Sequence, residues 1–405
     1  MKKMLIMTSG MYGGGVEKAL LNMLHFIPRN EYTITLLLLK MEGEFLPLLP
    51  KDIILKEINV KQLSSNEFMR NKSMKRLVYD YVKAGKFLKA MNSICRKYFY
   101  KDYFYYIPNK IEALENMDKD LEEEYDLAIC YHIHCPFNLA YIAKKVKAHK
   151  KIAWIHNDFK TTKFPVKQLF RYFDCYAEFY VVSDQLKSEF MEVMPLKYHN
   201  QVTVFKNILL PDAISRMSYE FIPQEYQSIS KITYKLLSIG RLTSQKGFDV
   251  AIQVCSKLKE QGKDFIWYII GEGEDRKKLE DEINEFNVGD RIKLLGLRMN
   301  PYPYIKNCDI YVQPSRHEGY GIAVAEARVL HKPIICTDFV GAFEQITNGI
   351  NGFIVHFSVE ELTNAILNLM QDEELRNRLE DNLKRELTYN QLIADDNVKT
   401  LLNSI

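Results

Sequence analysis

Two glutamates eight positions apart, Glu318 and Glu326, are the residues of this chain most suited to chemistry. A strand-like run, 309–315, precedes them, and Gly319 and Gly321 stand where a helix-forming run begins. Glycines let the backbone approach a ligand closely, and the start of a helix directs free N–H groups at it. That arrangement favours a phosphate or another anion. Because carboxylates repel phosphate, the glutamates are expected to bind hydroxyls, and a ligand with both groups is a nucleotide-sugar.

Two cations follow an apolar run in the second half of the chain. Arg241 directly follows the run 234–240, and Lys246 comes five positions later. Parallel sheets bind ligands outside the carboxyl ends of their strands. Two positive charges there would stabilise the negative charge that develops on a departing diphosphate. A strand-end arginine paired with an aspartate, beside a solvated lysine, is the structural alternative. The neighbouring glutamate pair favours the functional interpretation.

The E-x7-E pattern in this setting resembles the retaining glycosyltransferases of family 4. Further motifs match that family in its order and cover nearly the whole chain: Gly13-Gly14-Gly15-Val16-Glu17, Gly240-Arg241-Leu242 with Lys246-Gly247, Gly271-Glu272-Gly273, Thr337-Asp338, Asn348-Gly349 and Gly352-Phe353. The resemblance implies an α/β protein with the GT-B fold, in which two Rossmann-like domains face each other across a cleft.

The resemblance also implies a role for each charged residue of the motifs. Arg241 and Lys246 would contact the donor phosphates, and Glu326 would accept hydrogen bonds from the ribose hydroxyls. Glu318 would bind hydroxyls of the transferred sugar, with a helix-capping carboxylate as its structural alternative. Backbone N–H groups after Glu318 would touch the sugar or the phosphate, namely those of Gly319, Tyr320, Gly321 and Ile322.

Five further residues match family positions around the cleft. Gly14 and Gly15 would face the donor, where a glycine N–H can touch the diphosphate. His156 matches a strand-end histidine that contacts the sugar and positions the reacting groups, and near its unperturbed pKa it could also move a proton. Asn207 would stabilise the cleft, and Glu272 would lie near the nucleotide base unless it is a solvated loop residue. Two other histidines compete for the role of His156: His132 and His134.

Length and composition fit a protein with two globular domains. The chain has 405 residues, and domains of about 200 residues are ordinary. Seven scattered cysteines without a C-x-x-C pair favour reduced, buried thiols in a cytoplasmic chain. The apolar start Met4–Met7 is too short for a signal peptide, and no run reaches the roughly 18 apolar residues of a membrane span. The expected location is the cytoplasm or the inner face of the cell membrane.

Apolar strand-like runs alternate with helical patterns, which predicts parallel sheets covered on both faces. The runs are 4–9, 33–39, 126–132, 151–156, 178–183, 202–206, 234–240, 265–271, 292–296, 309–315, 333–338 and 352–355. Two such sets predict an acceptor-binding domain over 1–212 and a donor-binding domain over 213–388. A weakly patterned stretch, 211–230, is the expected linker. By resemblance, a helix in 389–405 returns to the first domain.

One segment, 61–110, departs from this alternation. It holds twelve lysines and arginines against three acidic residues, together with eleven phenylalanines and tyrosines. Basic residues near an anionic membrane surface contribute about 1 kcal/mol each, and aromatic rings suit that interface. Two helices with aromatics packed inward and solvated charges outside explain the segment equally well. Nucleic acid fits less well because no recognition motif accompanies the charge.

These observations predict a retaining glycosyltransferase that moves a sugar from a nucleoside diphosphate donor, preferably UDP, to a hydroxyl of a glycan or lipid-linked saccharide. We expect no metal and no cofactor. The D-x-D motif Asp118-Lys119-Asp120 lies in an acidic helix-like run, and no His/Cys cluster has zinc spacing. The alternatives are a GT-B nucleotide-sugar epimerase, a catalytically inactive partner of another transferase that binds sugar nucleotides, and a membrane-surface scaffold.

Overall fold

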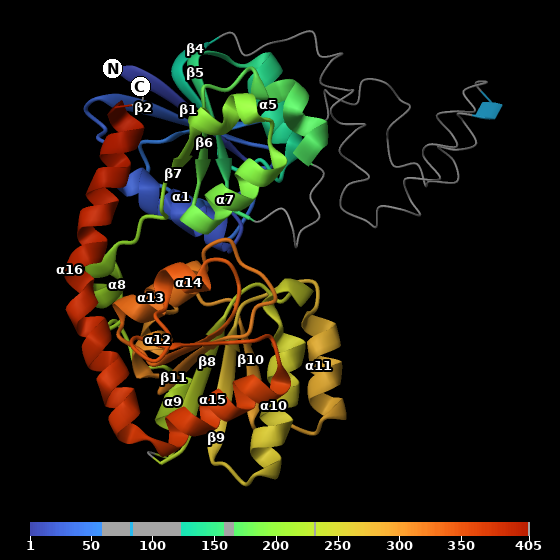
Figure 1. Ribbon diagram of the computed structural model, residues 1–405, viewed down its shortest axis with the longest axis vertical. Coiled ribbons are helices and arrows are strands. Elements are labelled where there is room, and N and C mark those ends of the chain that lie inside the picture. Colours follow the sequence, from blue (N-terminus) through green and yellow to red (C-terminus); the bar gives the residue numbers. More distant parts are fainter. Residues whose placement is uncertain (59–81, 84–122, 158–165, 231, 404–405) are drawn as a thin grey trace.

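The computed structural model describes residues 1–58, 82–83, 123–157, 166–230 and 232–403. The basic aromatic segment 61–110, apart from residues 82 and 83, and the motif at 118–120 therefore lie outside the described residues. Figure 1 shows two α/β domains stacked along the long axis, with one long C-terminal helix running beside both. In the described ranges, no helix is both long and apolar enough to cross a membrane.

The first domain is built on a seven-stranded sheet in the order β3-β2-β1-β4-β5-β6-β7. All its neighbouring strands pair in parallel, as expected for continuous apolar runs. The strands are β1 (Lys2–Thr8), β2 (Tyr32–Leu38), β3 (Ile54–Glu57), β4 (Glu124–Cys130), β5 (Lys147–Ile155), β6 (Glu178–Val181) and β7 (Val202–Val204).

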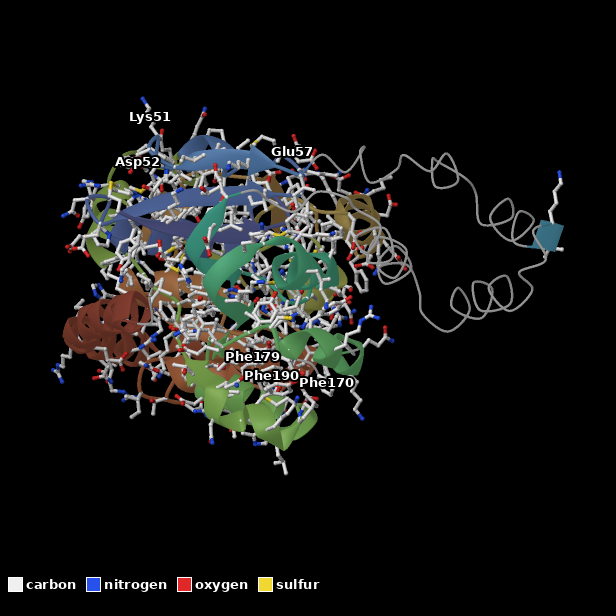
Figure 2. All side chains as sticks on the ribbon, turned by 90° about the horizontal axis from the view of Figure 1, so that it is seen from above. Lys51, Asp52, Glu57, Phe170, Phe179 and Phe190 are labelled. Carbon is white, nitrogen blue, oxygen red and sulfur yellow. The ribbon has the colours of Figure 1, made fainter. Side chains whose placement is uncertain are left out.

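Helices cover this first sheet and share one large apolar core with it. They are α1 (Gly15–Phe26), η1 (Leu46–Leu48), α5 (Pro136–Lys145), η5 (Val166–Leu169), α6 (Phe170–Phe173), α7 (Asp184–Val193) and η6 (Leu196–Gln201). The side chain of Ser183 caps α7 by accepting a hydrogen bond from the N–H of Leu186. Phe179 of β6 and Phe190 of α7, which lie close together in Figure 2, have ring centroids 5.8 Å apart.

The second domain has a six-stranded, all-parallel sheet in the order β10-β9-β8-β11-β12-β13. Its strands are β8 (Tyr234–Ile239), β9 (Phe265–Ile270), β10 (Ile292–Gly296), β11 (Ile310–Gln313), β12 (Ile334–Thr337) and β13 (Phe353–Val355). Alternate strand residues enter two different cores, because Leu236 packs on one face of the sheet and Leu237 on the other.

The helices of the second half divide between those two faces. They are α8 (Pro211–Met217), α9 (Gln224–Gln227), η7 (Ser244–Lys246), α10 (Phe248–Glu260), α11 (Arg276–Glu285), α12 (Tyr302–Asn307), α13 (Ile322–Val329), α14 (Ala342–Gln345), α15 (Val359–Gln371) and α16 (Glu373–Asn403). One core contains residues of α10, α11 and α15, and the other contains residues of α8, α12 and α13. The two-sheet architecture confirms the predicted pair of Rossmann-like domains.

The expected linker differs from the observed structure, and the last helix reaches the first domain as expected but begins earlier than residue 389. The stretch 211–230 contains α8 and α9, and it packs against the second domain. The chain leaves the first core at Ile208 and joins the second at Leu209. The last helix, α16, is continuous from Glu373, and near its end Leu401 is fully buried in the core of the first domain. The C-terminus thus lies beside the N-terminus in Figure 1.

Candidate active site

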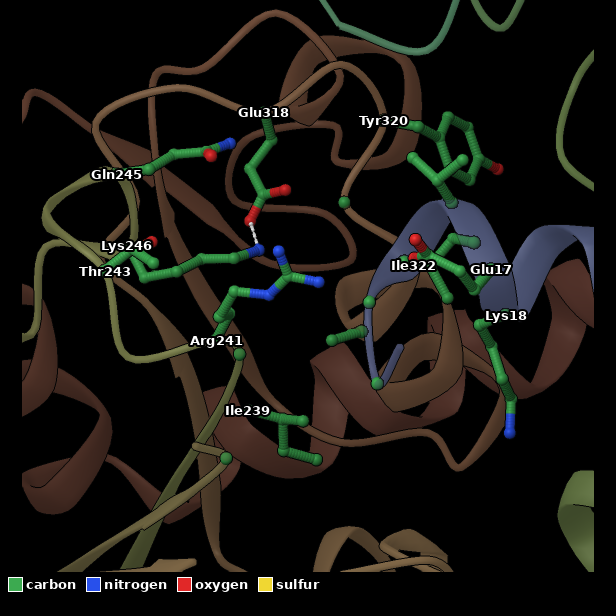
Figure 3. A pocket seen from close by; sticks show the side chains of 18 of the residues that line it. Glu17, Lys18, Ile239, Arg241, Thr243, Gln245, Lys246, Glu318, Tyr320 and Ile322 are labelled. Atoms are coloured by element: carbon green, nitrogen blue, oxygen red, sulfur yellow. Dashed lines mark hydrogen bonds and ion pairs between the residues drawn. The ribbon is translucent and has the colours of Figure 1, made fainter. Parts of the chain in front are cut away.

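A cavity of about 480 Å³ lies between the two domains. Its lining comes from the loops that follow the carboxyl ends of strands in both sheets, where parallel sheets bind ligands. Twelve of the thirteen predicted site residues line it: Gly14, Gly15, His156, Asn207, Arg241, Lys246, Glu318, Gly319, Tyr320, Gly321, Ile322 and Glu326. Figure 3 shows side chains of α1 facing those of the second domain across this space.

Glu318 is held as an ionic partner of Lys246. Its side chain is 9% exposed, and it accepts hydrogen bonds from Lys246 Nζ and from Ser315 Oγ, the latter at 2.9 Å. Figure 3 shows this pair as a bridge between the loop before α13 and the η7 turn. A buried carboxylate is costly without such partners. The pair therefore presents a nearly neutral polar surface to a ligand, which suits the hydroxyls of a sugar.

Arg241, in contrast, is exposed and has no such ionic partner among the described residues. In the described part of the chain, its guanidinium forms no hydrogen bond or ion pair. It reaches toward the glycine loop of the first domain, since a methyl group on Gly14 would stand 3.1 Å from Nη2. Its charge lowers the pKa of Glu17, but burial raises that pKa by more. Arg241 is thus free to bind an anion from solution.

Glu326 lies one turn into α13, where it is 4% exposed. The helix begins after Gly321, whose φ of +85° is a left-handed conformation that favours glycine. Burial raises the pKa of Glu326, and the hydroxyl of Tyr302 donates to its carboxylate at 2.9 Å. Tyr302 belongs to α12 and was not predicted, because nothing in its own stretch of sequence indicates a carboxylate partner 24 positions away.

Two histidines of the first domain, His132 and His156, lie on the opposite wall of the cavity. His156 is 4% exposed, and its ring lies 4.6 Å from that of Tyr131 and 5.9 Å from that of His132. Burial lowers the pKa of His156 well below its ordinary value, and burial with nearby Arg241 lowers the pKa of His132 to about 4. The lowered pKa disfavours the proton transfer that a histidine near its unperturbed pKa could perform. A neutral ring can still donate or accept a hydrogen bond.

The loop before α13 touches the first domain directly. A methyl group on Gly319 would stand only 1.8 Å from the carbonyl oxygen of His156, so only glycine fits this contact. The next residue, Tyr320, packs against the cores of both domains. The loop 318–321 is therefore held between the two domains.

Glu272 is the predicted site residue that does not line the cavity. Its carboxylate pairs with Arg276, four positions later on α11, at 2.6 Å. Glu274 lines the cavity in its place. The alternative of a solvated loop glutamate thus describes Glu272 better. Among the described residues, no group of three or more His, Cys, Asp and Glu side chains is arranged to hold a metal ion.

Comparisons with known proteins agree with this geometry. HepE from Anabaena, solved in complex with UDP-glucose, superimposes with a TM-score of 0.72 at 17% identity, over 100% of both chains. The chain therefore has the GT-B fold that its sequence predicts. Residues 224–386, which hold the second sheet, match the family model described as glycosyl transferases group 1.

The matches to two curated relatives are longer than residues 224–386. An uncharacterised glycosyltransferase of Methanocaldococcus jannaschii is 26% identical over 247 residues, which are 53% of this chain and 61% of the relative. An N,N'-diacetylbacillosaminyl-diphospho-undecaprenol alpha-1,3-N-acetylgalactosaminyltransferase of Campylobacter jejuni is 25% identical over 254 residues, 60% of this chain and 64% of the relative. The chain spans less than two thirds of either protein.

Proposed function

We propose that this protein is a retaining glycosyltransferase that moves a sugar from UDP to a hydroxyl of a glycan or lipid-linked saccharide. One observation carries the proposal. Two cations, the N-terminus of α13 and two buried carboxylates converge on a single cavity between the domains. The chemistry of that set matches a diphosphate linked to two polyols, and the family match over 224–386 supports it.

Each part of the donor has a natural place in the cavity. The diphosphate would lie against Arg241 and the N-terminus of α13, where positive charge is least committed. The ribose would bind Glu326, which is buried and accepts hydrogen bonds. The sugar would lie between the Lys246–Glu318 pair and neutral His156. The opposite orientation would place phosphates against carboxylates and is electrostatically unfavourable.

The resemblance to family 4 suggests how the transfer proceeds. The bond between the anomeric carbon and the phosphate oxygen breaks, and the acceptor oxygen bonds to that carbon on the same face. The departing phosphate oxygen takes the acceptor proton. Arg241 and the α13 N–H groups would stabilise the charge of the leaving diphosphate, so that no metal is required. The contact between Gly319 and His156 would exclude water that would otherwise hydrolyse the donor.

The acceptor would enter from the first domain, beside His132 and Asn207. The name of the Campylobacter relative specifies a lipid-linked saccharide, which supports an acceptor of that class here. The protein would then work at the inner face of the cell membrane, with 61–110 as the candidate contact. An epimerase or an inactive partner would have less use for an uncommitted Arg241 opposite two buried glutamates, so transfer is favoured.

The anomeric configuration of the product tests this proposal. With UDP-α-linked sugars, no added metal and a panel of lipid-linked saccharides, we expect an α-linked product, detected from the anomeric proton signal by NMR. Glu318→Gln should abolish its formation because the sugar loses its charged hydroxyl acceptor. A β-linked product would contradict the retaining mechanism, and equal turnover by the Gln variant would contradict the site.

A further inference from the structure

Lys18 is a cavity-lining cation that the sequence analysis did not single out. It lies on α1, one turn after the glycine loop, and its N–H donates to the carbonyl oxygen of Gly14 at 3.0 Å. In Figure 3 its side chain leaves the α1 ribbon beside Glu17 and extends away from the Lys246–Glu318 pair. It therefore lies in a different part of the cavity from the Lys246–Glu318 pair.

The ammonium group of Lys18 lies over aromatic rings from both domains. Nζ is 5.0 Å from the ring centroid of Tyr302 in the second domain and 5.8 Å from that of Phe45 in the first. These distances fit cation–π contacts. The hydroxyl at the far end of the Tyr302 ring donates to Glu326 at 2.9 Å. A cation of one domain is thus linked through one ring to the buried carboxylate of the other.

We propose that Lys18 is a positioning residue that couples closure of the two domains to binding of the donor ribose by Glu326. The inference rests on the proposed function, because it assumes that a nucleotide fills the cavity. When the domains are together, α1 contacts α13 and brings a positive charge to the ribose carboxylate. When they separate, Glu326 loses that charge.

Within the described residues, Lys18 forms no ion pair, and it is the cation whose charge acts on Glu326. Two phenols lie around the carboxylate, Tyr302 of α12 and Tyr311 of β11, and burial raises the pKa of both well above the ordinary value. Both are neutral in the physiological range. Glu17 precedes Lys18 on α1 and lines the same cavity, and burial raises its pKa as well, so its titration is common to the wild type and the Lys18 variants. Arg328 of α13 is engaged elsewhere, at 2.9 Å from a glutamate of α16.

The direction of the effect follows from these charges. Burial raises the pKa of Glu326, and Lys18 lowers it. The ionised carboxylate accepts hydrogen bonds from both ribose hydroxyls, so nucleotide affinity should fall as the pH drops through this pKa. Removal of Lys18 leaves only the hydrogen bond from Tyr302 to oppose the effect of burial, and the fall in affinity should then begin at a higher pH.

Calorimetric titration of the full chain with UDP between about pH 5 and about pH 8, without metal, tests the proposal. We expect Lys18→Met to raise the midpoint of the pH profile by roughly one unit, which is about tenfold in affinity below the midpoint. Lys18→Arg should restore the wild-type profile. Lys306→Met is the matched control, since Lys306 lies 3.8 Å over the ring of Tyr219 and does not line the cavity.

A double variant separates this role from direct contact with the nucleotide. In a Glu326→Gln background, Lys18→Met should weaken binding little further. An unmoved midpoint in Lys18→Met, or the same weakening with and without Glu326, would overturn the inference while the proposed function stands. Absence of UDP binding by the wild-type protein at every pH would overturn the proposed function and this inference with it.

Discussion

Arg241→Ala is expected to lower kcat/KM for sugar transfer by about 10²–10³-fold, the usual loss when one preorganised donor to a developing negative charge is removed. Arg241 is exposed, so its removal breaks no ion pair or hydrogen bond of its guanidinium within the described residues. The melting temperature should therefore stay near that of the wild type. Steady-state kinetics with a UDP-sugar and a scanning calorimetry trace provide the two readouts.

Arg378→Ala is the matched control, since Arg378 is an exposed arginine of α16 outside the cavity lining. Its transfer rate should be unchanged. Lys246→Ala is a less clean probe because it would leave the carboxylate of Glu318 buried without its cation. Near-normal transfer by Arg241→Ala would remove the leaving-group role from this residue and with it the assignment of the diphosphate site.

Gly319→Ala is expected to reduce transfer at least 100-fold while the second domain still binds nucleotide. The new methyl group would stand 1.8 Å from the carbonyl oxygen of His156, so the loop must withdraw from the first domain. A displacement of about 1 Å can cost 10²-fold in rate. Arg241 and Glu326 belong to the second domain and keep their positions. The expected signature is a low kcat with a UDP dissociation constant close to that of the wild type.

Gly289→Ala serves as the control for the loss of a glycine. A methyl group there meets only a side-chain carbon at 3.6 Å, which is ordinary van der Waals distance, and the site lies away from the cavity. Its kinetics should match the wild type. If Gly319→Ala also transferred sugar at the normal rate, the contact between the loop and His156 would not belong to the active arrangement.

The sheets could be predicted closely from the sequence because their strands are buried on both faces. Each of the twelve expected apolar runs overlaps an observed strand. One observed strand, β3, has no matching expected run, and it lies at the edge of the first sheet. Two of its four residues, Ile54 and Leu55, are exposed, and the other two are charged. An edge strand of this kind has neither a continuous apolar run nor strict alternation.

The cleft could be predicted only where local sequence carries the signal. Glu318, Glu326 and the two glycines between them lie within nine positions, and that spacing indicates their chemistry. Tyr302 and Lys18 act on Glu326 from separate helices, and no local pattern links them to it. Such contacts depend on how the two domains meet.

Glu272 shows the opposite failure, in which a matching motif does not place a side chain in the cavity. The glutamate follows β9, as its motif requires, yet Arg276 draws its carboxylate onto α11. The ion pair joins the loop after β9 to Arg276, the first residue of α11. A motif fixes the path of the backbone more reliably than the direction of an exposed side chain.

Titration of the metal-free protein with UDP, GDP and ADP by calorimetry tests the central claim most directly, with Glu326→Ala measured in parallel. We predict that UDP binds selectively and that the variant weakens its binding by about 10–100-fold, the range for a lost hydrogen bond to a charged group. Failure of the wild-type protein to bind any of the three nucleotides would contradict the account, because the converging charges of the cleft would then have no donor to hold.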